Sequence, residues 1–88
     1  MVNYSWVIYM KSTFGEKIKF LREKNDLSQT ELGSSVEMTQ RKVSYLESGK
    51  YEPNLEDIRQ LCHFFNVSAD YLLDLPGNLP NPDRPVRT

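Results

Sequence analysis

Residues 27–56 read LSQTELGSSVEMTQRKVSYLESGKYEPNLE, and this stretch determines the predicted fold. Ser28 can accept a hydrogen bond at the start of a helix, and Glu31 follows three residues later, as a capping box requires. Thr39 begins a second helix after a break. Gly49 ends that helix, because glycine adopts the left-handed conformation at least cost. The stretch therefore predicts two short helices joined by a tight turn.

The polar face of the second helix carries side chains that suit nucleic acid. They are Gln40, Arg41, Lys42, Ser44 and Tyr45. Such groups hydrogen-bond base edges or phosphates, and none of them is acidic. Glutamine suits the major-groove edge of adenine and arginine that of guanine, so Gln40 and Arg41 are the predicted base readers. An exposed helix start has no packing need for either residue.

The spacing of many residues resembles the helix-turn-helix of the phage-repressor family, the Cro-like or XRE type. The matching positions are Ser28-Gln29, Leu32, Gly33, Glu37, Val43, Leu46, Glu47, Gly49-Lys50, Pro53 and Leu55. The resemblance covers roughly residues 14–75. It implies an all-α, five-helix, lambda-repressor-like DNA-binding domain that acts as a homodimer.

The resemblance also implies roles for individual residues. Gln29, at the start of the first helix of the motif, would contact a phosphate; the alternative is an ordinary first-turn residue. Further DNA contacts, mostly to the backbone, are predicted for Thr39, Lys42, Ser44, Tyr45, Lys50, Tyr51 and Asn54. Arg22 would pair with Glu47 and so tie the first helix of the domain to the second helix of the motif.

Two residues depart from the family pattern. Glu37 stands in the turn where glycine is usual, and a positive φ at such a residue costs about 1 kcal/mol, so we expect strain or a reshaped turn. Gly33 replaces the usual alanine. This exchange weakens a helix by about 1 kcal/mol, although it allows close helix approach.

Three further helices are predicted around the motif by local capping signals. Capping boxes begin at Thr13 and Asn54, and Ser68 caps the last helix. The residues expected to face the core are Phe14, Ile18, Leu21, Leu55, Ile58, Leu61, Cys62, Phe65, Tyr71, Leu72, Leu73 and Leu75. Lys17, Lys19 and Lys24 are expected on the solvated surface.

The two ends of the chain differ from this central domain, residues 12–75. Residues 1–11 alternate in a period of two, which fits either a β-arm that pairs with a neighbour or an unstructured extension. Residues 76–88 are rich in proline and poor in apolar residues, so we expect a flexible tail.

Composition limits the remaining classes of function. The 88 residues carry a net charge of −1, with eight basic against six acidic side chains over residues 11–50 and three against six over residues 51–88. A single cysteine allows no intrachain disulfide and no multi-cysteine zinc site, so neither a metal nor a cofactor is expected. No apolar run reaches the roughly 18 residues that a membrane span needs, and we expect a cytoplasmic protein. No set of catalytic residues is recognisable, so an enzyme is not expected.

The predicted function is therefore that of a transcriptional regulator, a repressor by resemblance, that reads double-stranded DNA as a dimer. The alternative is a protein-interaction module, such as an antitoxin or a regulator that binds a protein partner. Near-neutral charge, Glu37 in the turn and the aromatic N-terminus favour this alternative. Substitution of Arg41 would separate the two, because it should abolish DNA binding and spare partner binding.

Overall fold

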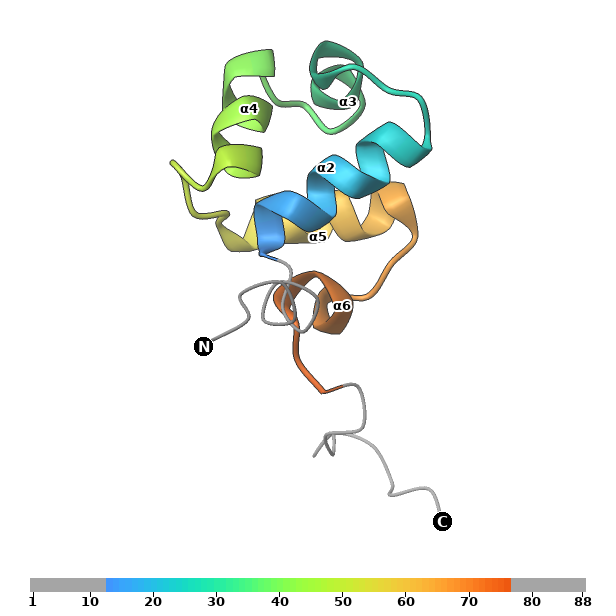
Figure 1. Cartoon of the computed structure of the whole chain (residues 1–88), viewed down its shortest axis with the longest axis vertical. Helices are drawn as coiled ribbons and strands as arrows, with labels where there is room; N and C mark the ends of the chain where they lie inside the picture. Colours follow the sequence, from blue (N-terminus) through green and yellow to red (C-terminus); the bar gives the residue numbers. More distant parts are fainter. Residues whose placement is uncertain (1–12, 77–88) are drawn as a thin grey trace, which may run out of the picture.

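The computed structural model describes residues 13–76, which form an all-helical domain. Its helices are α2 (Phe14–Lys24), α3 (Gln29–Ser35), α4 (Gln40–Ser48), α5 (Leu55–Phe65) and α6 (Ala69–Leu73). Figure 1 shows α3 and α4 together at one end of the molecule and α6 at the other end, with α2 and α5 overlapping in the middle of the view. The five predicted helices are confirmed. The predicted β-arm and the proline-rich tail lie outside the described residues.

Side-chain caps begin every one of these helices. Thr13, Ser28 and Asn54 form full capping boxes with the acidic residue three positions later. Thr39 and Ser68 accept a single backbone hydrogen bond each. Each cap satisfies an N–H group that has no partner within its own helix, so the helix starts are set by local sequence.

The core lies between α2, α3, α4, α5 and α6. Its buried members are Ile18, Leu21, Leu32, Val36, Val43, Leu61 and Leu72. Cys62 packs against this cluster, as expected of a small apolar residue, and burial raises the pKa of its thiol. Burying these aliphatic side chains, at roughly 1.5–3 kcal/mol each, is what holds the short helices together.

Some expectations about burial were wrong. Leu55 is 78% exposed, because it occupies the first position of α5, on the side of the helix that turns away from the core. Tyr71, Leu73 and Leu75 are also exposed, since the five-residue α6 buries only Leu72.

Lys17 is the opposite case, because it is 8% exposed instead of solvated. Its ammonium lies 3.4 Å from Asp74 and 5.3 Å from the ring centroid of Tyr71. Its aliphatic stem is covered and its charge is paired, which is how a lysine can be buried. The contact fastens α6 to α2.

Gly15 and Gly33 lie where two backbones meet. A Cβ atom at Gly15 would overlap the carbonyl oxygens of Leu46 and Glu47 at the end of α4. One at Gly33 would overlap the carbonyl oxygen of Met38 in the turn after α3. Glycine at position 33, where the family usually has alanine, therefore has a second effect besides weakening the helix. It leaves room for the Met38 carbonyl and so permits this tight turn.

Candidate nucleic-acid interface

Helices α3 and α4 form the helix-turn-helix, and the turn between them is tight. Helix α3 ends at Ser35 with Val36 as its C-cap, and the next residue, Glu37, adopts φ 59°, in the left-handed region. The Met38 N–H then donates to the Gly33 carbonyl at 2.8 Å. This bond closes the turn without a glycine at Glu37, so Glu37 takes up the strained conformation and the turn keeps its form.

Gln40, the first residue of α4, is linked to Gln29, the first residue of α3. The Gln40 amide nitrogen donates to the Gln29 side-chain oxygen at 2.6 Å. The Gln29 amide nitrogen in turn donates to Glu47 at 3.1 Å. Both polar ends of Gln29 are thus engaged inside the protein, and its side chain fixes the position of Gln40 beside it.

Glu47, at the end of this chain of hydrogen bonds, is held in place by Arg22. Arg22 donates to it through Nε at 2.6 Å and through a terminal nitrogen at 3.1 Å, and also donates to the Leu27 carbonyl at 2.9 Å. The side chains are only 11% and 5% exposed for Arg22 and Glu47. The hydrogen bond to Glu47 raises the pKa of the guanidinium, so Arg22 stays charged. The structure thus contains the expected ion pair and extends it to Gln29 and Gln40.

Arg41 is exposed, and within residues 13–76 its guanidinium makes no hydrogen bond or ion pair. Ser44 and Tyr45 are half-buried one turn further along α4. Beyond them Tyr51 packs edge-on against Tyr45, with ring centroids 4.8 Å apart, and Lys50 lies 5.1 Å from the Tyr45 ring. These side chains continue the polar and aromatic surface from α4 into the following loop.

Three of the predicted DNA contacts also have structural partners. The Lys42 ammonium binds Asp57 at 2.8 Å and so joins α4 to α5. The side chains of Thr39 and Asn54 accept the capping hydrogen bonds of α4 and α5. Residues engaged in this way are less available to a ligand than Arg41.

Three side-chain contacts in this region were not predicted from the sequence: Gln40 with Gln29, Gln29 with Glu47, and Lys42 with Asp57. The sequence predicted separate DNA contacts for Gln29 and Gln40. It did not predict the hydrogen bond between them, because that bond depends on how α3 packs against α4. Lys42 and Asp57 are 15 positions apart, and only the capping role of Asp57 has a local signal.

Among the described residues no three potential metal ligands come together. None of the described helices has the length and hydrophobicity to cross a bilayer.

Residues 15–78 match the model of a protein family described as "Helix-turn-helix domain". The chain belongs to this family. Its repressor-like, XRE-type architecture agrees with the resemblance found in the sequence.

Individual relatives are regulators. The chain is 37% identical over 60 residues to the "HTH-type transcriptional activator BcrR" of Enterococcus faecalis, covering 68% of this chain and 29% of that protein. It therefore spans less than a third of that relative. It is 28% identical over 54 residues to an uncharacterised HTH-type transcriptional regulator, MJ0272, of Methanocaldococcus jannaschii, covering 61% and 82% of the two chains.

The fold also matches a repressor solved on DNA. The P22 c2 repressor, crystallised with a synthetic operator, superposes with a TM-score of 0.68 and 33% identity over 72% of this chain and 96% of that one. The chain thus shares its family and its fold with DNA-binding regulators.

Proposed function

We propose that this helix-turn-helix protein is a sequence-specific transcriptional regulator that binds operator DNA as a homodimer and reads the major groove with α4. The observation that carries the proposal is the position of Gln40, at the exposed first turn of α4 and oriented by Gln29. A helix of this kind enters the groove with its N-terminal residues against the bases. The P22 c2 repressor, with its operator complex, supports this arrangement.

Gln40 has the chemistry to recognise adenine. One of its amide hydrogens is donated to Gln29, which leaves its carbonyl oxygen and a second hydrogen for a ligand. Adenine presents one donor and one acceptor in the major groove, so the two groups match. Gln29 acts in this proposal as a positioning residue instead of a phosphate contact.

Arg41 is the second proposed base reader, with guanine as its preferred partner. Lys50 and Tyr51, in the loop after α4, are the best-placed phosphate contacts because both are exposed. Ser44 and Tyr45 contribute where α4 passes the backbone. We assign Lys42, Thr39 and Asn54 mainly to holding α4 and α5 in place.

The dimer contact is proposed on α6. Tyr71, Leu73 and Leu75 are 41%, 42% and 48% exposed, so three large apolar side chains face solvent within five residues. A two-fold contact uses the same surface on both copies, and an apolar face suits it. Replacing Leu73 with glutamate should leave a monomer in sedimentation equilibrium, while Arg59→Glu, on the outer face of α5, should not.

Selection of bound sequences from a random duplex pool tests the proposal. The wild-type chain should recover an inverted repeat, and Arg41→Ala should lose the preference at one position of each half-site. Arg59→Ala removes the same charge away from α4 and should recover the wild-type sequence. Sequence-blind retention by the wild-type chain would contradict the proposal.

A further inference from the structure

All five described helices end in the same way. The residue in the left-handed conformation is Asp26, Glu37, Gly49, Asn66 or Asp74, with φ between 57° and 84°. In each case the next N–H donates to a carbonyl five residues earlier, at 2.8–3.1 Å. Four of these residues are glycine, asparagine or aspartate, which tolerate this conformation best. Glu37 is the exception.

The conformation of Glu37 has no compensation within the described part of the protein. Its side chain is exposed, and its carboxylate accepts no hydrogen bond and forms no ion pair between residues 13 and 76. The capping bond at this turn is made by the backbone, so a glycine would close it with less strain. A strained residue without an internal role points to a function outside the fold.

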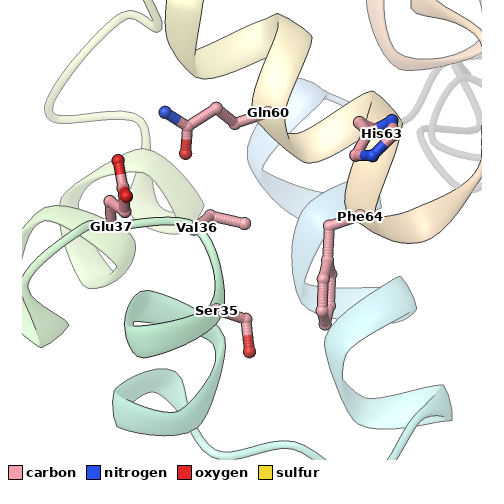
Figure 2. A pocket seen from close by; sticks show the side chains of 6 residues that line it. All are labelled: Ser35, Val36, Glu37, Gln60, His63 and Phe64. Atoms are coloured by element: carbon pink, nitrogen blue, oxygen red, sulfur yellow. The ribbon is translucent and has the colours of Figure 1, made fainter.

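Glu37 lines an open depression between the α3–α4 turn and α5. The depression measures about 340 Å³ and is lined by Ser35, Val36, Glu37, Gln60, His63 and Phe64. Figure 2 shows these side chains around it, with Gln60, His63 and Phe64 coming from α5. Phe64 is 39% exposed, and Figure 2 shows it across the depression from Glu37, so its ring contributes an apolar wall opposite the carboxylate.

The charge of this surface indicates its partner. A carboxylate repels phosphate, so the depression does not suit DNA, although it borders the helix-turn-helix. Ser35 and Gln60 are neutral, and the only other titratable lining group is His63. A depression with an unpaired acid on one side and an aromatic ring on the other suits a long side chain with a cation on an apolar stem, because both parts of such a side chain find a contact.

We infer that this depression docks a lysine or arginine side chain of a partner protein, presented next to an apolar residue. Glu37 binds the cation, and Phe64 contacts its stem and the apolar neighbour. The inference gives a surface and a chemistry to the protein-interaction alternative. It does not rest on DNA reading, since Gln40 and Arg41 take no part in it.

A random-peptide phage library, selected on the full chain, supplies the probe. The enriched peptides should share a lysine or arginine beside an apolar residue. A fluorescent peptide of the consensus sequence should bind Glu37→Gln about tenfold more weakly, which corresponds to ~1.4 kcal/mol. The matched control is Glu52→Gln, which removes an exposed carboxylate elsewhere and should bind as the wild type does.

A second variant separates binding from folding. Glu37→Gly removes the carboxylate and the strain together, so it should raise the midpoint of thermal unfolding and still lose the peptide. Selected peptides without basic residues, or equal binding by wild type and Glu37→Gln, would overturn the inference. DNA affinity should remain at least as high in both variants, whichever sequence the protein reads.

Discussion

At the scale of single residues, the requirement for glycine comes from tertiary contacts. Gly33 lies in the middle of α3, where alanine would normally favour the helix by about 1 kcal/mol. The backbone of Met38 occupies the space where a Cβ would go. The close approach closes the turn between α3 and α4, and so sets how α4 is presented.

Gly33→Ala is therefore expected to destabilise the domain by about 1–3 kcal/mol, despite the better helix propensity. Urea unfolding followed by circular dichroism measures the change. Ser34→Ala is the matched control, because Ser34 is the next residue of the same helix and is exposed. It should leave stability unchanged or raise it slightly, and a stable Gly33→Ala protein would show that the turn can relax.

The sequence predicted that Gly33 weakens its helix and allows close helix approach. It did not predict that the Met38 carbonyl occupies the space of a Cβ atom at this position. It also predicted strain at Glu37, and the positive φ is present. Local rules predict such features because they depend on neighbours in the chain. Local rules could not predict the hydrogen bond from Gln40 to Gln29, because it joins two helices and residues 11 positions apart in the chain.

At the scale of helices, Lys42 and Asp57 connect α4 to α5. Asp57 also completes the capping box of α5 through its own side chain. Asparagine at this position could keep the cap, because its side-chain oxygen still accepts, but it would lose the ion pair. The effect of the exchange therefore isolates the link between the two helices.

Asp57→Asn is expected to lower the free energy of unfolding by about 1–2 kcal/mol. Chemical denaturation measures it, and the same substitution in a Lys42→Met protein should cost clearly less, because the partner is already gone. If the two effects simply add, the ion pair contributes nothing to stability.

Arg22 and Glu47 join α2 to α4, and as a pair their side chains are more buried than those of Lys42 and Asp57. Arg22→Met would leave Glu47 charged with its side chain only 5% exposed, so we expect a loss of about 3–5 kcal/mol. Adding Glu47→Leu should restore most of it, as measured by thermal and urea unfolding. A small loss for Arg22→Met alone would mean that water reaches Glu47.

The pH dependence of this pair follows from the pKa of Arg22, which its hydrogen bond to Glu47 raises above the ordinary value. Stability from a raised pKa is fully present below the unfolded value and is lost as pH rises through the folded one. Both values are strongly alkaline for arginine, so the Arg22 contribution should stay constant across the neutral range.

The helix starts were predictable because capping boxes are local, and all five caps occur at the predicted residues. Which residues of α5 and α6 are buried could not be predicted in the same way. Leu55 is exposed because it is the first residue of α5. Tyr71 and Leu73 are exposed because the five-residue α6 buries only Leu72, which lies between them. Lys17 is buried because α6 folds back against α2, which no local pattern reveals.

At the scale of the whole molecule, the charge distribution shapes DNA binding. The net charge is −1, and the small basic excess lies within residues 11–50, which include the helix-turn-helix. Few phosphates can be neutralised, so affinity for nonspecific DNA should be modest and should fall with salt. In the proposed function, discrimination between sequences is assigned to base contacts by α4.

The most direct test of base reading replaces one atom of the operator. In the selected duplex, the adenine whose preference disappears in Gln40→Ala is exchanged for 7-deazaadenine, which lacks the major-groove acceptor N7. Fluorescence anisotropy should show weaker binding by wild type, within the roughly 1–3 kcal/mol of a bidentate contact, and no further loss for Gln40→Ala. Unchanged affinity of the wild-type chain for the modified duplex would contradict major-groove reading by Gln40.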